Sequence, residues 1–212
     1  MHFSNEKPGC CHPGFSSIHG GDFMDIKNVL VGISGSIGAV EIQNYLAALR
    51  STWGASVHVI MTESAASMLQ SKTVNYFIDG NVFLKSTDST DQFKIPHIHL
   101  TTWADLMVII PASANIIGKV ANGIADDLLS TAAMAAKCPV VFCPNMNEHM
   151  LNRPAMQRNM HQLKEDGYLI IDPGEEEAIQ LSTGQKVQGA MPGFSQFIPR
   201  LEETLRGQGL YV

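Results

Sequence analysis

Long apolar runs are missing from this sequence of 212 residues, so no helix long enough to span a membrane is predicted. The N-terminus lacks a basic region followed by an apolar core, which argues against a secretory signal. Basic residues are also scarce, because 14 Lys and Arg face 20 Asp and Glu and no basic cluster occurs. We therefore expect a cytoplasmic protein with neither a membrane nor a nucleic acid as partner.

Cysteine is equally sparse, with four in the chain. Cys138 and Cys143 lie in or beside apolar segments and are interpreted as reduced thiols in the cytosol. The cysteines and histidine at positions 10–12 lack the paired spacing of a structural zinc site, so no metal is expected. Residues 1–25 are rich in Gly, Ser, Pro and His without apolar periodicity, which predicts a flexible extension ahead of one domain over residues 26–212.

What the sequence does contain is a series of short apolar runs, each followed by a polar loop and a helical pattern. The runs that we predict as buried parallel strands are residues 28–33, 56–61, 104–110 and 139–143. Their alternation with helices predicts an α/β fold with a doubly wound parallel sheet, in a flavodoxin-like or Rossmann-like three-layer sandwich. Because the loops follow the carboxyl ends of parallel strands, they should share one edge of the sheet and form one site.

The loop over residues 32–38 is suited to phosphate. Its glycines let the backbone approach a ligand, and Ser34 and Ser36 can add hydroxyl groups to the free N–H groups at the start of the following helix. After the second strand, Thr62 is an N-cap, a phosphate ligand, or both. The glycine spacing is not that of the dinucleotide fingerprint, so a tight turn without a ligand remains an equal alternative for this loop alone.

Several linked motifs are more specific than any one of these loops. They are His97, Trp103-Ala104-Asp105, Pro111-Ala112-Ser113-Ala114-Asn115, the segment 121–129, and the segment 144–150 with the sequence PNMNEHM. In order and spacing, over roughly residues 27–191, the chain resembles the homo-oligomeric flavin-containing cysteine decarboxylases. That family includes the peptidyl-cysteine decarboxylases of lantibiotic biosynthesis and the phosphopantothenoylcysteine decarboxylases of coenzyme A synthesis.

The resemblance implies a flavin cofactor, FMN, with FAD as a possible alternative. The residues then expected to bind it are Gly32, Ser34, Gly35, Ser36, Thr62, Ser64, Pro111, Ala112, Ser113, Ala114 and Asn115. By the same resemblance His97 and Asn147 are the catalytic residues, and Asn147, Met150 and Thr183 contact the substrate. In that family the flavin takes two electrons from a Cys side chain, and the resulting thiocarbonyl group accepts the electrons released with CO₂.

Two departures from the family pattern bear on the reaction. Leu151 stands where the family has Trp, and Thr183 stands in the flap, residues 181–191, where coenzyme A-pathway enzymes carry a Cys that reduces the enethiol. We therefore expect oxidative decarboxylation of the C-terminal Cys of a ribosomally made precursor peptide to an aminoenethiol, for aminovinyl-cysteine ring formation. The alternatives are a phosphopantothenoylcysteine decarboxylase, a flavin prenyltransferase, and a flavin-binding regulatory subunit without activity. The family's assembly predicts a homotrimer, with four trimers in a dodecamer.

Simpler explanations exist for the same residues. A histidine near an apolar segment is more often structural than catalytic, and Asn147 could merely close a turn. Asp126 is more simply explained as an N-cap than as a ligand. The placement of these residues beside the flavin loops, together with the resemblance, favours the functional interpretation of His97 and Asn147.

Overall fold

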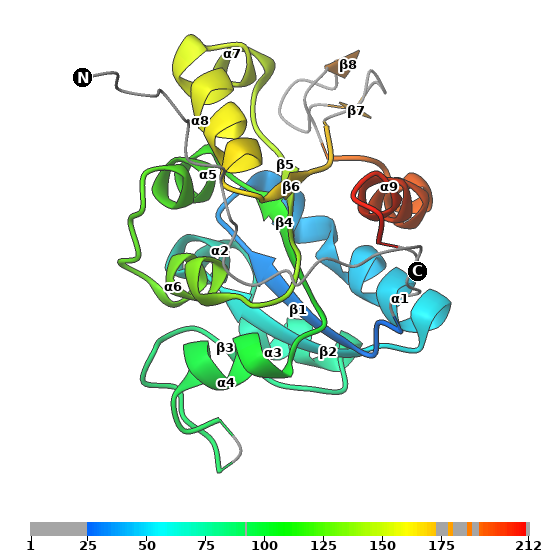
Figure 1. Cartoon of the computed structure of the whole chain (residues 1–212). Helices are drawn as coiled ribbons and strands as arrows, with labels where there is room; N and C mark the ends of the chain where they lie inside the picture. Colours follow the sequence, from blue (N-terminus) through cyan, green and yellow to red (C-terminus); the bar gives the residue numbers. More distant parts are fainter. Residues whose placement is uncertain (1–24, 92, 173–177, 180–185, 188–190, 211–212) are drawn as a thin grey trace, which may run out of the picture.

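A six-stranded, all-parallel sheet in the order β3-β2-β1-β4-β5-β6 forms the middle layer of the computed structural model (Figure 1). The structure describes residues 25–91, 93–172, 178–179, 186–187 and 191–210. The predicted extension therefore lies outside the described residues, as does most of the predicted flap. The strands are β1 (Asn28–Ile33), β2 (Ser56–Met61), β3 (Val82–Phe83), β4 (Leu106–Ala112), β5 (Val140–Pro144) and β6 (Leu169–Ile170), with a separate antiparallel pair β7 (Ala178–Ile179) and β8 (Lys186–Val187).

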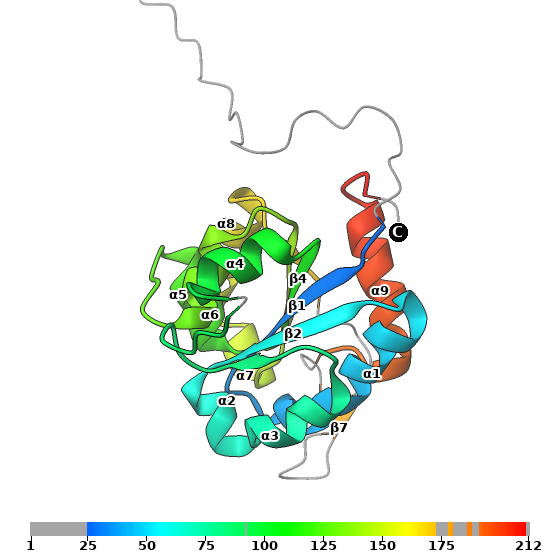
Figure 2. The ribbon, with the colours of Figure 1, turned by 90° about the horizontal axis from the view of Figure 1, so that it is seen from below.

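Helices cover both faces of the sheet, as Figure 2 shows from below. The described helical segments are η1 (Ile37–Glu41), α1 (Ile42–Trp53), α2 (Glu63–Met68), α3 (Ser71–Val74), η2 (Asn75–Phe77), α4 (Pro96–Trp103), α5 (Ala114–Ala121), α6 (Leu128–Ala135), α7 (Glu148–Leu151), α8 (Pro154–Glu165) and α9 (Phe194–Arg206). On one face α1 and α9 pack together, and on the other lie α4, α5, α6 and α8. The predicted doubly wound three-layer sandwich is confirmed.

The two cores follow from side-chain alternation along the strands. In β1 Val29 and Val31 face the core with α1 and α9, whereas Leu30 faces the core with α4, α5, α6 and α8. Because successive side chains of a strand point to opposite faces, a strand buried on both sides is apolar throughout. This explains the short continuous apolar runs that identified the strands in the sequence.

The order of the strands determines where a ligand can bind. From β1 the chain moves outward through β2 and β3, and then returns to place β4 on the other side of β1. The crevice beyond the carboxyl ends of β1 and β4 is therefore the switch point at which doubly wound sheets bind ligands. The order 3-2-1-4-5-6 is the one found in Rossmann folds.

Element boundaries differ from the prediction at a few places. β1 and β2 occupy the predicted residues, but β4 extends to Ala112, so Pro111 and Ala112 belong to the strand and not to the loop. A cis peptide bond joins Ile110 to Pro111 at this end of β4. The first helix opens with the 3-10 segment η1, and α1 proper follows. Within the described residues no helix combines the length and apolar character needed to cross a bilayer.

Candidate cofactor and substrate site

A cavity of about 280 Å³ opens at the carboxyl ends of β1, β2 and β4. The residues that line it come from three of the loops predicted to bind the cofactor and from the helices that follow them. They are Ser34, Gly35, Thr62, Glu63, Ser64, Ser113, Asn115, Ile116, Lys119, Asp126 and Asp127. Six of the eleven residues expected to bind a flavin thus line one cavity, in agreement with the prediction that these loops share an edge of the sheet.

Ser34 joins the two loops on either side of the switch point. Its side chain is buried, and its hydroxyl donates to the carbonyl oxygen of Pro111 at 2.7 Å. The same hydroxyl oxygen accepts from the main-chain N–H of Ser113 at 2.8 Å. Since its single proton is donated to Pro111, the Ser34 hydroxyl group has none left for a ligand. Its role at the cavity is to link the loop after β1 to the end of β4.

Part of the cavity lining consists of hydroxyl groups at helix starts. Thr62 caps α2 by accepting from the N–H of Ala65 at 3.2 Å, and Ser113 caps α5 by accepting from the N–H of Ile116. Gly35 brings the loop after β1 against α2, because a Cβ atom on this residue would lie 2.4 Å from the Cβ atom of Ser64. Only glycine allows this approach, which places hydroxyl and N–H donors from three elements around one space.

Another part of the lining carries charge. The ammonium group of Lys119 contacts Asp126 Oδ1 and Asp127 Oδ2, each at 2.7 Å. The hydrogen bonds that the ammonium group donates to these two carboxylates raise the pKa of Lys119. Burial works to raise the pKa of Asp127, but hydrogen bonds from Lys119 and Ser130 outweigh it and the pKa is lowered. Both partners of this pair are therefore held in their charged forms.

The charged residues of the lining were not predicted from the sequence, and one helix start was misplaced. Asp127, and not Asp126, is the N-cap of α6, where it forms a capping box with Ser130. Lys119 was not singled out, although it lies four residues after Asn115 on α5. Residues at this spacing share a helix face, so the position of Asn115 was a signal that could have identified Lys119.

The remaining predicted cofactor residues do not line the cavity. They are Gly32, Ser36, Pro111, Ala112 and Ala114. Ala112 is fully buried in the core formed with α4, α5, α6 and α8, so its side chain has no access to a ligand. Gly32 leaves space for Leu129, which a Cβ atom would meet at 2.4 Å. The assignment of these five residues to the cofactor site stays a prediction.

The predicted substrate residues follow β5, on the strand next to β4. Asn147 is exposed and caps α7, its Oδ1 atom accepting from the N–H of His149 at 2.8 Å. Its amide N–H₂ group has no hydrogen-bond partner among the described residues and remains available as a donor. Met150 is 48% exposed on α7, and Leu151, in place of the family's Trp, packs against the adjoining core. Thr183 lies outside the described residues.

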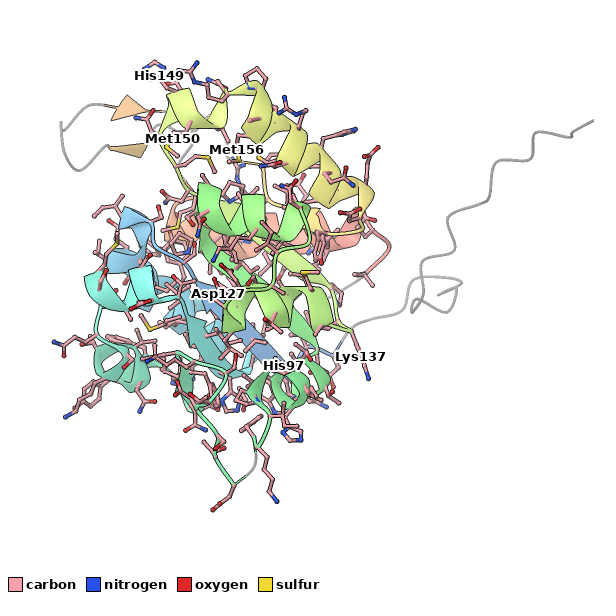
Figure 3. All side chains as sticks on the ribbon, turned by 90° about the vertical axis from the view of Figure 1, so that its left-hand side faces the viewer. His97, Asp127, Lys137, His149, Met150 and Met156 are labelled. Atoms are coloured by element: carbon pink, nitrogen blue, oxygen red, sulfur yellow. The ribbon has the colours of Figure 1, made fainter. Side chains whose placement is uncertain are left out.

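His97 lies apart from these residues. It belongs to α4, which packs against α6, whereas α7 adjoins α8 beyond α5. Figure 3 accordingly shows His97 on one side of Asp127, and His149 and Met150 on the opposite side. The Nδ1 atom of His97 is buried without a hydrogen-bond partner in the part of the chain described. Buried polar atoms in native proteins are usually hydrogen-bonded, so this atom is a site for a hydrogen-bond partner from outside the chain.

His99 behaves differently from His97. Its Nδ1 atom accepts from the main-chain N–H of Ile95 at 3.2 Å. His99 is therefore a hydrogen-bonded residue of α4.

The residues that line the cavity fit a flavin mononucleotide. A phosphate group needs N–H and hydroxyl donors, and the cavity offers the hydroxyls of Thr62, Ser64 and Ser113 near two helix starts. Lys119 is the single basic residue of the lining and is paired with both Asp126 and Asp127, while Glu63 adds a third carboxylate. Neutral donors would therefore hold the phosphate, and Asn115 and Lys119 would adjoin the rest of the cofactor.

Comparison with known proteins identifies the family of this chain. Residues 20–205 match the family described as Flavoprotein. The mersacidin decarboxylase of a Bacillus species is 38% identical over 160 residues, which cover 76% of this chain and 80% of that protein. The coenzyme A biosynthesis bifunctional protein CoaBC of Bacillus subtilis is 42% identical over 152 residues, which cover 72% of this chain but 37% of that protein.

Solved structures give the same result. The FMN-dependent cysteine decarboxylase SpaF superposes with a TM-score of 0.67 at 33% identity, covering 82% of this chain and 97% of SpaF. A variant of EpiD in complex with a substrate peptide superposes with a TM-score of 0.71 at 26% identity, covering 83% of this chain and 98% of EpiD.

Proposed function

This chain belongs to the Flavoprotein family, and from that premise we propose that it decarboxylates the C-terminal Cys of a ribosomally made precursor peptide, with oxidation, to an aminoenethiol. The observation that carries the proposal is the cavity at the switch point, whose lining includes the hydroxyl groups of Thr62, Ser64 and Ser113, with Asn147 following the neighbouring strand β5. The aminoenethiol would serve in closing an aminovinyl-cysteine type ring. FMN is the cofactor, and when bound it supplies the two-electron oxidation of the Cys side chain.

Asn147 would bind the terminal carboxylate of the peptide. Its Oδ1 atom is occupied by the helix cap, so the side chain presents only its N–H₂ group outward. A carboxylate is an acceptor without protons to donate, and this fixed orientation therefore suits it. Met150, exposed on the same short helix, would cover the peptide and exclude water.

His97 would accept the thiol proton as general base. Its imidazole is half-buried and has an unpartnered Nδ1 atom, so a partner from outside the chain would complete its hydrogen bonds. General bases of this type act within hydrogen-bond distance of the proton that they remove. Because α6 and α5 separate His97 from α7 within one chain, His97 and Asn147 would meet one peptide only if they came from different copies.

A homotrimer, with four trimers in a dodecamer, provides such shared sites. The surface that supports assembly includes Ile98 on α4, 48% exposed, and Met134 on α6, 43% exposed. These two helices pack side by side, and a neighbouring copy that covered both would bury these apolar side chains. Closed cyclic assemblies bring different faces of neighbouring copies together.

A cytoplasmic location suits this chemistry. Cys138 and Cys143 are both free in the described part of the chain. Free thiols persist in a reducing compartment, where the thiol of a precursor peptide would also remain unpaired.

Thr183 determines the proposed product. Its hydroxyl cannot supply the electrons that would reduce the enethiol, so the reaction would end there, and O₂ would reoxidise the cofactor. The similarity to CoaBC makes phosphopantothenoylcysteine decarboxylation the second candidate.

Mass spectrometry distinguishes these two reactions. The purified yellow protein is incubated in air with a Cys-terminated peptide and, separately, with 4′-phosphopantothenoylcysteine. We expect the peptide to lose about 46 mass units, which correspond to CO₂ and two hydrogens. A loss of about 44 mass units from the pantothenoyl compound, with the peptide unchanged, would contradict the proposal, because that product requires reduction of the enethiol.

A further inference from the structure

Ser36 was expected to bind the cofactor, but its hydroxyl points to a different part of the site. Its Oγ atom lies 2.9 Å from the carbonyl oxygen of Asn145 and 3.0 Å from the Oδ1 atom of the same residue. A hydroxyl has one proton to donate, so Asn145 holds it through one or both oxygens. Ser36 also lies outside the cavity lining, although Ser34 and Gly35 belong to it.

Asn145 is held from a second direction as well. Its main-chain N–H donates to the carbonyl oxygen of Ala112 at 2.9 Å, at the end of β4. Gly38 makes room for the Asn145 side chain, because a Cβ atom there would lie 2.4 Å from Asn145 Nδ2. The first residue after β5 is therefore fixed between the end of β4 and the loop after β1.

Asn147 follows two residues later and starts α7. We propose that Ser36 is a positioning residue for the substrate: by holding Asn145 it sets the place of Asn147 relative to the cofactor cavity. This inference rests on the proposed function, in which Asn147 binds the peptide carboxylate. The loop after β1 then acts on both the cofactor and the substrate. Ser34 and Gly35 line the cofactor cavity, and Ser36 orients the segment from Asn145 to Asn147.

The test compares Ser36→Ala with Ser64→Ala, which removes a hydroxyl that does line the cavity. Both holoenzymes are assayed for flavin content by absorbance, for the Kd of FMN after its removal, and for kcat and KM with the Cys-terminated peptide. For Ser36→Ala we expect unchanged flavin binding and a KM raised by about tenfold, the scale of one lost hydrogen bond. For Ser64→Ala we expect weaker flavin binding and a KM close to that of the wild type.

Two further measurements separate positioning from general damage. Ser36→Thr keeps the hydroxyl and should restore the KM. A Ser-terminated peptide, which lacks the thiol and is not turned over, allows its Kd to be measured by calorimetry even for impaired variants. Ser36→Ala should weaken this binding in the wild-type background but not in an Asn147→Ala background, because the effect runs through Asn147.

Two outcomes would overturn the inference. One is loss of flavin by Ser36→Ala, as in Ser64→Ala, with peptide affinity unchanged. The other is an equal weakening of peptide binding with and without Asn147. Either result removes the positioning role. If Ser36→Ala does not fold, Ser36→Cys, whose thiol is a weak donor, takes its place. If the wild type acts only on 4′-phosphopantothenoylcysteine, the proposed function fails, and the same KM comparison with that compound still tests Ser36.

Discussion

His58 is a buried histidine that takes no part in the proposed chemistry. It lies on β2, and its ring contacts Trp103 and Phe93 with centroid distances of 4.4 and 4.7 Å. Its Nδ1 atom accepts from the main-chain N–H of Asn81 at 2.8 Å. Burial lowers the pKa of His58, so the native protein holds this side chain in the neutral form.

The stability of the protein should therefore fall in mild acid. In the unfolded chain a histidine takes up a proton below about pH 6.5, whereas in the native state the lowered pKa of His58 opposes protonation. The contribution of His58 is present above that pH and is lost as the pH falls toward the native pKa. Thermal unfolding between pH 7.5 and 5.0 should show a decreasing Tm.

Two substitutions attribute this decrease to the buried ring. His58→Asn keeps an acceptor for Asn81 but does not titrate, so its Tm should depend less on pH while being lower throughout, because the aromatic contacts are lost. His161, which is exposed on α8, provides the matched control as His161→Gln. An equal loss of pH dependence in both variants would contradict the assignment.

Among the helices of the described chain, side-chain N-caps are concentrated at the site. Thr62, Ser113, Asp127 and Asn147 cap α2, α5, α6 and α7, all of which begin at this edge of the sheet. By contrast α1, α3, α4, α8 and α9 have no side-chain cap. The polar residues that a ligand needs therefore also satisfy the N–H groups of the helix starts.

Asp127 combines a cap with an ion pair, and two substitutions can separate them. Asp127→Asn keeps the oxygen that accepts from the N–H of Ser130 at 2.8 Å, whereas Asp127→Ala removes it. We expect both variants to be less stable than the wild type, with Ala lower than Asn by about 1 kcal/mol for the lost cap. Urea unfolding monitored by circular dichroism measures the difference.

Asp126→Ala is the control, since Asp126 contacts Lys119 but caps no helix and its side chain is 59% exposed. The loss in stability should stay below about 1 kcal/mol, as for other exposed ion pairs. If Asp127→Asn and Asp127→Ala were equally stable, the cap would contribute nothing.

The sequence predicted elements and motif positions better than the contacts between them. β1 and β2 were identified correctly because these segments of six residues are mostly apolar, which reflects burial on both faces. The start of α6 was placed one residue early because Asp126 and Asp127 are chemically alike, and only the position of Ser130 at N3 selects the second. The partner of Ser36 lies 109 residues away in the chain, and no local pattern encodes such a pairing.

At the scale of the whole molecule, the sequence predicted the family and cofactor, and both are confirmed. It also grouped His97 and Asn147 on one rim, whereas in a single chain α5 and α6 separate the helices that carry them. Motif order along the chain gives no information about which copy supplies each residue. The assembly therefore becomes part of the hypothesis about the active site.

Complementation between inactive variants tests that hypothesis. His97→Asn and Asn147→Ala should each be inactive alone while retaining flavin. When the two are co-expressed with different tags and mixed oligomers are purified, sites that combine an intact His97 with an intact Asn147 should recover about a quarter of wild-type activity for random assembly.

The matched control pairs His97→Asn with the His97→Asn, Asn147→Ala double variant, which cannot supply an intact His97 from any copy. If mixed oligomers of His97→Asn and Asn147→Ala recovered no more activity than this control, both residues of a site would come from the same chain.

The bond network of Ser34 has a consequence for the order of events during biogenesis. The buried Ser34 hydroxyl group links the loop after β1 to Pro111 and Ser113 by hydrogen bonds within the protein. The two loops beside the cofactor cavity are therefore held together without a contribution from the cofactor. The polypeptide can therefore fold before FMN binds, and the cofactor then enters a cavity that is already formed. The apoprotein should consequently remain competent to take up FMN from solution, and loss of flavin during purification should be reversible.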